Sequence, residues 1–193
     1  THPTPCRSDD EIAMRAGTAK RVITPQGDEP LTLVMGVKPT GVEHDIYVRA
    51  LVLNDGENRL AILTYDLNCL DVATPILRER CRDEVGIDAS QLIILSTQNH
   101  AAPIQLVPDN FEYGRWLAER SFEVIEEAIT AERGPATVEI GSGNGYFVQS
   151  VGNAPVDSEI QVMRVSVDDE PVALLFNHPI HPLQFSRTEI DPG

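Results

Sequence analysis

The sequence predicts an α/β fold in which a mixed β-sheet is flanked by helices. Three observations support this class: β-rich runs joined by a short turn, apolar runs at helical spacing, and an order in which strands alternate with those helices. A hairpin makes neighbouring strands antiparallel, whereas a strand–helix–strand crossover makes them parallel, so both kinds of pairing are expected. The 193 residues are enough for one domain with a sizeable core.

The N-terminal elements are an extended segment, a strand and a hairpin. Residues 1–15 are polar with two prolines and are expected to lead into a domain at 16–193. The first strand is expected at Ala16–Pro25, with the proline at its end. Tyr47–Leu53 and Leu60–Thr64 flank an Asn-Asp-Gly turn, which is a strong antiparallel hairpin signal.

Two helices follow from capping residues and apolar spacing. The first is expected to start with Thr74 as N-cap and Pro75 at the first helical position, and to end at Gly86. The second is expected from about Phe111 to Ala131, before Gly134-Pro135. The predicted buried residues are Ile76, Leu77, Cys81 and Val85 in the first helix and Leu117, Val124, Ile125, Ala128 and Ile129 in the second.

The C-terminal half is expected to contain more strands. Residues 141–155 are rich in Gly and Asn without a helical period, and we expect a loop there. This loop is not of the phosphate-binding type, because neither Lys-Ser/Thr nor a helix follows it. A turn at 168–171 joins the last two strands. The remaining strands are predicted at Leu92–Leu95, Ala136–Ile140, Gln161–Val167 and Val172–Phe176.

The composition is strongly acidic, with 30 Asp and Glu against 15 Lys and Arg and a net charge of −15. Such a chain is repelled by nucleic acids and by anionic membrane surfaces. The three cysteines, Cys6, Cys69 and Cys81, have no Cys-x-x-Cys spacing, and their odd number favours free thiols over a disulfide framework.

Polar side chains gather where predicted strands end, which is where open α/β sheets bind ligands. A histidine at such a position can bind zinc through a neutral imidazole nitrogen, and catalytic zinc sites use about three protein ligands and a water. The alternative is that such a histidine is a hydrogen-bonded loop residue that does not bind a metal. The candidates are Asp66, the cluster Gln98, Asn99 and His100, the pair His178 and His181, and His44 just before a strand.

Several segments resemble the N-terminal part of the neutral/alkaline ceramidase family in order and approximate spacing. They are "AGTAKRVITPQG", "VEHDIYVRALVLNDG", "LAILTYDLNCLD", "IILSTQNHAAP", "VDSEIQVMRV" and "VALLFNHPIHP". Members of that family look like zinc-dependent amide hydrolases in which metal-bound water attacks an N-acyl bond. The resemblance therefore implies a hydrolase, a zinc cofactor and a secreted or periplasmic location.

The resemblance also implies site residues. The family's His-Pro zinc ligand matches His181. The family's Thr-His-Thr-His-Ser-Gly-Pro reads Thr-Gln-Asn-His-Ala-Ala-Pro here, so the transition-state histidine is kept as His100 and the first metal histidine is Gln98. The family's arginine has no counterpart between Arg133 and Arg164. These differences point to a substrate other than ceramide.

Three functions are compatible with these residues. In the first, an amide hydrolase holds a divalent metal through His181 and His100, with Gln98 and Asn99 in the catalytic cluster and His44, Asp66 and His178 contacting substrate. In the second, the same scaffold has no metal, and Gln98, Asn99 and His100 form a polar pocket for a non-ceramide ligand or for hydrolysis by a different nucleophile. In the third, it is a non-catalytic binding domain.

The family resemblance further predicts that residues 16–193 are one portion of a larger catalytic domain. In the family, two zinc histidines lie in this portion, while a Glu and a Tyr that complete the site come from later in the chain. A second chain or a C-terminal part is therefore expected to complete the site. If processing near Gly193 produces that second chain, its new N-terminal residue is a candidate nucleophile for the metal-free alternative.

Overall fold

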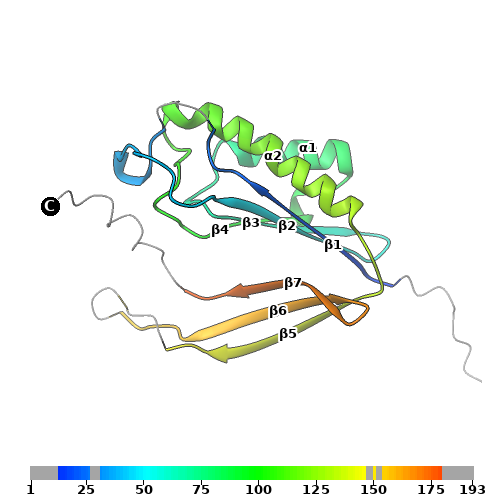
Figure 1. Cartoon of the computed structure of the whole chain (residues 1–193). Coiled ribbons are helices and arrows are strands. Elements are labelled where there is room, and N and C mark those ends of the chain that lie inside the picture. Colours follow the sequence, from blue (N-terminus) through cyan, green and yellow to red (C-terminus); the bar gives the residue numbers. More distant parts are fainter. Residues whose placement is uncertain (1–12, 27–30, 147–149, 151–153, 180–193) are drawn as a thin grey trace, which may run out of the picture.

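The protein consists of two β-sheets, one of them mixed, and two α-helices (Figure 1). The computed structural model describes residues 13–26, 31–146, 150 and 154–179. The expected α/β class with a mixed sheet and flanking helices is confirmed. The division into two sheets was not foreseen, and it decides where the candidate site residues lie.

The first sheet has the strand order β1-β2-β3-β4. β3 and β4 run parallel, and the other neighbouring pairs are antiparallel. The predicted hairpin is confirmed: β2 and β3 are joined at Asp55, whose carboxylate accepts hydrogen bonds from the backbone N–H groups of Glu57 and Asn58. The strands are β1 (Arg15–Val22), β2 (Tyr47–Asn54), β3 (Arg59–Tyr65) and β4 (Leu92–Ser96).

Both helices, α1 (Ala73–Val85) and α2 (Phe111–Thr130), cover the same face of the first sheet (Figure 1). Gly17 on β1 allows close contact with α2, because a Cβ there would lie 2.0 Å from the backbone oxygen of Ala128. The predicted end of α1 is confirmed, with Gly86 in the left-handed conformation. This face therefore carries the main hydrophobic core.

The predicted N-cap of α1 is wrong. Thr74 lies inside the first turn, and its hydroxyl donates to the backbone oxygen of Leu70 at 2.8 Å. The preceding backbone N–H, that of Ala73, is instead bound by the side-chain oxygen of the fully buried Gln105 at 3.1 Å. A distant side chain thus supplies the interaction that a local cap usually provides.

The second sheet is antiparallel, with the order β5-β6-β7 for β5 (Ala136–Asn144), β6 (Glu159–Val167) and β7 (Glu170–Asn177). Asp168 and Asp169 form the β6–β7 turn with positive φ angles of 52° and 63°, as in a tight hairpin. The expected loop at 141–155 is wrong in its first part, because β5 continues to Asn144. Its pairing with β6 overrides the weak strand propensity of the glycines.

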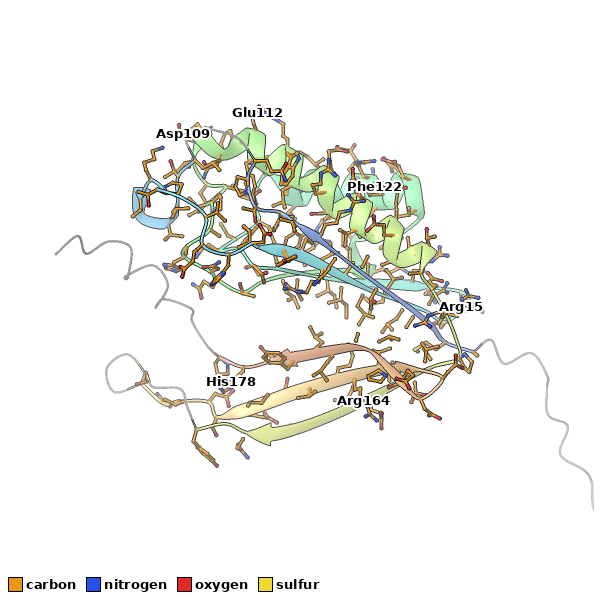
Figure 2. The ribbon with its side chains drawn as sticks, in the orientation of Figure 1. Arg15, Asp109, Glu112, Phe122, Arg164 and His178 are labelled. Carbon is orange, nitrogen blue, oxygen red and sulfur yellow. The ribbon has the colours of Figure 1, made fainter. Side chains whose placement is uncertain are left out.

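The second sheet packs against the face of the first sheet that the helices leave uncovered (Figure 2). The contact joins Leu51 and Ile62 of the first sheet with Val165 and Val167 of the second. These residues lie near the β6–β7 turn, so β7 runs away from this closed end of the sandwich. β3 also runs away from it, since Leu60 at its start belongs to the same cluster.

Three short 3₁₀ helices complete the described fold: Val34–Gly36, Ala89–Gln91 and Pro108–Asn110. Asn110 is fully buried and joins two loops, because its side chain accepts from Thr32 N–H at 2.9 Å and donates to the Ile104 oxygen at 2.6 Å. Among the residues that the structure describes, neither α-helix is long and apolar enough to cross a membrane.

Candidate functional site

The carboxyl ends of β3 and β4 lie side by side, as parallel pairing requires. The pairing continues past the strands: the Thr97 N–H donates to the Tyr65 oxygen at 3.0 Å, and the Asn99 N–H donates to the Leu67 oxygen at 3.1 Å. Asp66 and the Gln98–His100 segment are therefore neighbours at one edge of the first sheet. The carboxyl ends of β3 and β4 thus bring together Asp66 and the Gln98–His100 segment, which were both predicted to follow strands.

Asn99 holds the turn that carries its two neighbours. Its side-chain nitrogen donates to the Asp66 backbone oxygen at 3.3 Å, and its side-chain oxygen accepts from the Ala101 N–H at 2.9 Å. Gln98 is exposed and has a φ of 59°, a left-handed conformation that costs free energy in a residue with a side chain. His100 lies within this turn and is half-buried.

The Asp66 carboxylate is engaged by two partners. It accepts from the Tyr47 backbone N–H at 2.9 Å and from the Arg49 guanidinium at 3.0 Å. The Arg49 and Lys20 cations also lie over the Tyr47 ring, 5.1 and 5.0 Å from its centre. We did not identify Arg49 from the sequence, although its alternation with the buried Val48 and Ala50 places it on the opposite face of β2.

His44 lies on the segment that enters β2. The Asp66 N–H donates to the Tyr47 oxygen at 3.0 Å, so this entry adjoins the carboxyl end of β3. The His44 side chain is 80% exposed, and its Nε2 lies 4.0 Å from a Glu43 carboxylate oxygen. His44 thus lies at the same end of the first sheet, with its side chain in solvent.

His178 follows β7 and belongs to the second sheet, at the end opposite the β6–β7 turn (Figure 2). Its Nδ1 lies 3.4 Å from the Glu159 backbone oxygen. Glu159 and Asn177 also line an open pocket of about 510 Å³ on this sheet. His181 lies outside the described residues. β3, β4 and β7 therefore end at the same end of the sandwich, but on different sheets.

The described residues do not by themselves fit a zinc ion. Within 13–26, 31–146, 150 and 154–179 there is no group of three or more His, Cys, Asp or Glu side chains that could hold a metal. The Asp66 carboxylate is bound by Arg49, so the candidate metal ligands at the carboxyl ends of β3 and β4 are His100 and the weak ligand Gln98. A metal here would require His181 and a further ligand.

Cysteine chemistry is not favoured at this end. Cys69 and Cys81 are free thiols, as expected from the sequence, and Cys6 lies outside the described residues. Cys69 is half-buried, and burial raises the pKa of its thiol. A raised pKa leaves less of the nucleophilic thiolate at neutral pH, so Cys69 is a weak candidate for an activated nucleophile.

Comparisons with known proteins show which class of fold this is. No family model matches the chain, and no curated protein matches it by sequence. By structure, the chain has a neutral-ceramidase-like fold.

Two solved structures show the likeness. One is neutral ceramidase from Pseudomonas aeruginosa, with a TM-score of 0.73 and 17% identity over 90% of this chain and 33% of that chain. The other is a ceramidase complexed with C2, with a TM-score of 0.71 and 18% identity over 89% of this chain and 32% of that chain. This chain therefore spans about a third of either ceramidase, and at such identities the likeness establishes the fold.

Proposed function

We propose that this chain is one portion of an amide hydrolase whose substrate is an N-acyl compound other than ceramide. The observation that carries the proposal is the ceramidase-like fold over 90% of the chain, together with the polar cluster at the ends of β3 and β4. The coverage of 33% of the ceramidase chain supports a site completed by further polypeptide, on the same chain or on a second one.

His100 is the proposed catalytic residue of the described cluster. It is half-buried at a strand end, where an imidazole N–H can donate to the oxyanion that develops when an amide carbonyl is attacked. Asn99 positions it by holding the turn through its bonds to Asp66 and Ala101. Gln98 is exposed beside it and offers an amide for hydrogen bonds to substrate.

The outer residues have proposed roles in binding. Asp66 holds the carboxyl end of β3 against β2 through its hydrogen bonds to Tyr47 and Arg49. Its backbone oxygen accepts from the Asn99 side chain. His44 and His178 are proposed substrate contacts because they lie at the same end of the sandwich on its two sheets. His181 is the proposed ligand for a divalent metal, which when bound would supply a Lewis acid and an activated water.

The test compares metal content and turnover in the complete purified protein, with a fluorogenic N-acyl amide as substrate. We expect His100→Ala to lower turnover about a hundredfold, the size of the loss of one oxyanion donor. Its zinc content then separates the two roles proposed for His100: unchanged zinc assigns it to the oxyanion, and lost zinc makes it a metal ligand. We expect His181→Ala to remove zinc and activity together. Full zinc and full activity in the His181→Ala variant would refute the metal assignment.

Gln98→His provides a matched gain-of-function variant. It restores the histidine of the family motif at an exposed position whose backbone conformation is already set. We expect zinc to bind more tightly than in the parent protein, since imidazole is a better zinc ligand than an amide oxygen. His44→Ala is the control, because its exposed side chain is expected to affect substrate binding and not zinc content.

A metal-free hydrolase on the same scaffold is the second candidate, and the observation that favours it is Gln98 in place of a zinc ligand. This enzyme would use a nucleophile from the completing polypeptide, for example an N-terminal residue exposed by cleavage. Activity that survives dialysis against EDTA, in protein with no zinc by mass spectrometry, would favour this candidate.

A further inference from the structure

The two sheets present apolar side chains toward each other beyond the region where they touch. On the first sheet, Ile93 pairs directly with Ile62, and paired residues share a face. Ile62 is buried against the second sheet, but Ile93 is 40% exposed and Leu95, two residues on, is 44% exposed. The part of this face on β4 is therefore uncovered.

The second sheet shows the same change from covered to uncovered. Ile140, Met163 and Leu175 form one cross-strand row on its inner face. Met163 and Leu175 pack against the inter-sheet cluster, whereas Ile140 is 81% exposed. All three line the open pocket, together with Gln161 and Asn177. The uncovered surface is thus a continuation of the interface between the sheets.

The edge of β4 adds backbone groups to this surface. β4 is the last strand of its sheet among the described residues, and its sequence "LIILS" has no proline and no charge. Natural edge strands are usually protected by charges, prolines or bulges, and parallel strands are usually covered on both faces. β4 has neither form of protection, so its free edge is suited to pairing with another strand.

We propose that a β-strand from the polypeptide that supplies the rest of the ceramidase-like fold pairs with β4 and covers Ile93, Leu95 and Ile140. This inference rests on the proposed function only in taking the chain to be one portion of a larger unit, as its 33% coverage of the ceramidase chain supports. The partner strand is expected to alternate, with apolar side chains directed between the sheets and polar ones toward solvent.

The chemistry of the surface favours this occupant over two others. A lipid would cover the apolar side chains but would leave the N–H and C=O groups of the β4 edge without partners, whereas a strand satisfies both. A second copy of this chain carries the same net charge of −15, so like charges oppose its approach.

The test measures hydrogen–deuterium exchange of β4 in the complete protein, with its remaining polypeptide present. We expect the amides of residues 92–96 to be protected nearly as well as those of β3, which is paired on both sides. Leu95→Lys and Ile140→Lys should each speed exchange in 92–96 about tenfold or more by weakening the docking. Leu106→Lys is the control, since Leu106 is 59% exposed and lies outside both sheets.

Three outcomes would overturn the proposal. The first is rapid exchange of 92–96 in the complete protein. The second is an equal effect of Leu95→Lys and Leu106→Lys. The third is protection that comes from another source, either a second copy detected by light scattering or phosphatidylcholine vesicles added to the protein. Because none of these readouts is an enzymatic rate, failure of the docking proposal is distinguishable from failure of the hydrolase assignment.

Discussion

The two sheets of this protein differ in how they are covered. The first sheet has helices on one face and the second sheet on part of the other, and β3 carries fully buried residues such as Leu63 and Tyr65. Among the residues that the structure describes, the second sheet is covered on one face only, near the closed end. On its other face Leu174 and Phe176 are 65% and 64% exposed.

This difference shows which part of the site is supported by the described residues alone. His100 follows β4, whose Leu92 is buried in the main core and whose pairing with β3 continues to Asn99. His178 follows β7, which has no covering layer on its outer face among the described residues. Among the described residues, the first-sheet half of the candidate site is therefore better supported by packing than the second-sheet half.

The largest expected difference comes from replacing one leucine in each sheet with alanine. Leu63 is fully buried in β3, so Leu63→Ala is expected to lower the free energy of unfolding by about 3 kcal/mol, through lost burial and the cavity that remains. Leu174→Ala is expected to change it by less than about 0.5 kcal/mol, because the side chain is mainly exposed.

Urea unfolding followed by far-UV circular dichroism measures both leucine variants. The two expected changes refer to the 193-residue chain by itself. A Leu174→Ala variant that is destabilised as strongly as Leu63→Ala would show that the outer face of the second sheet is already buried in solution.

The sequence was sufficient to predict the elements whose signals are local. The hairpin around Asp55, the end of α1 at Gly86 and the extent of α2 follow from turn residues, a glycine C-cap and apolar spacing, and all are confirmed. Each of these signals involves residues close together in the chain, so no tertiary information was needed.

Features that depend on distant contacts were not predicted. Thr74 followed by Pro75 is typical of a helix N-cap, yet the Ala73 N–H is bound by the side chain of Gln105, 32 residues away. The glycines after Ile140 are typical of a loop, yet pairing with β6 keeps them in a strand. The separation into two sheets also depends on which strands pair, and alternation alone does not specify a partner.

The proximity of two candidate segments was predictable from the sequence, but their contacts were not. The rule that parallel strands gather ligands at their carboxyl ends correctly placed Asp66 beside the Gln98–His100 segment. The engagement of Asp66 by Arg49 could not be inferred, because it depends on a cross-strand neighbour and a side-chain conformation. The roles of His100 and His181 remain predictions.

A second test compares a buried carboxylate that follows α2 and binds two residues of the first sheet with an exposed carboxylate on the second sheet. The Glu132 side chain is 5% exposed and accepts from Arg59 at 2.8 Å and Asn54 at 2.7 Å. Glu132→Ala leaves these partners unsatisfied, and we expect a loss of about 2 kcal/mol, reduced by the partial exposure of the arginine.

Glu139 is the matched residue on the second sheet. It accepts from Arg164 Nε at 2.8 Å, and both side chains are more than half exposed. Glu139→Ala is expected to change the free energy of unfolding by less than about 0.5 kcal/mol. The same urea titration measures both variants, and equal losses would contradict the difference in burial between the two sheets.

The smallest expected effect is alkaline destabilisation that originates in the helix-covered layer. Burial raises the pKa of the Cys81 thiol on α1 from 9.0 to about 12, and it also raises the pKa values of the Tyr65 and Tyr113 hydroxyls. Because the folded pKa is the higher one, the unfolded chain loses its proton first. The contribution to stability is complete below pH 9 and is lost as the pH rises toward 12.

For Cys81 this loss amounts to about 1 kcal/mol at pH 10, one unit above the thiol's ordinary pKa. The second sheet adds nothing to it, since β5, β6 and β7 contain no Cys or Tyr. Urea unfolding at pH 8 and pH 10 should therefore show a smaller pH-dependent loss in Cys81→Ala than in the parent protein, although the variant is less stable at both values. An unchanged loss would mean that the buried tyrosines, or groups outside the helix-covered layer, account for the alkaline sensitivity.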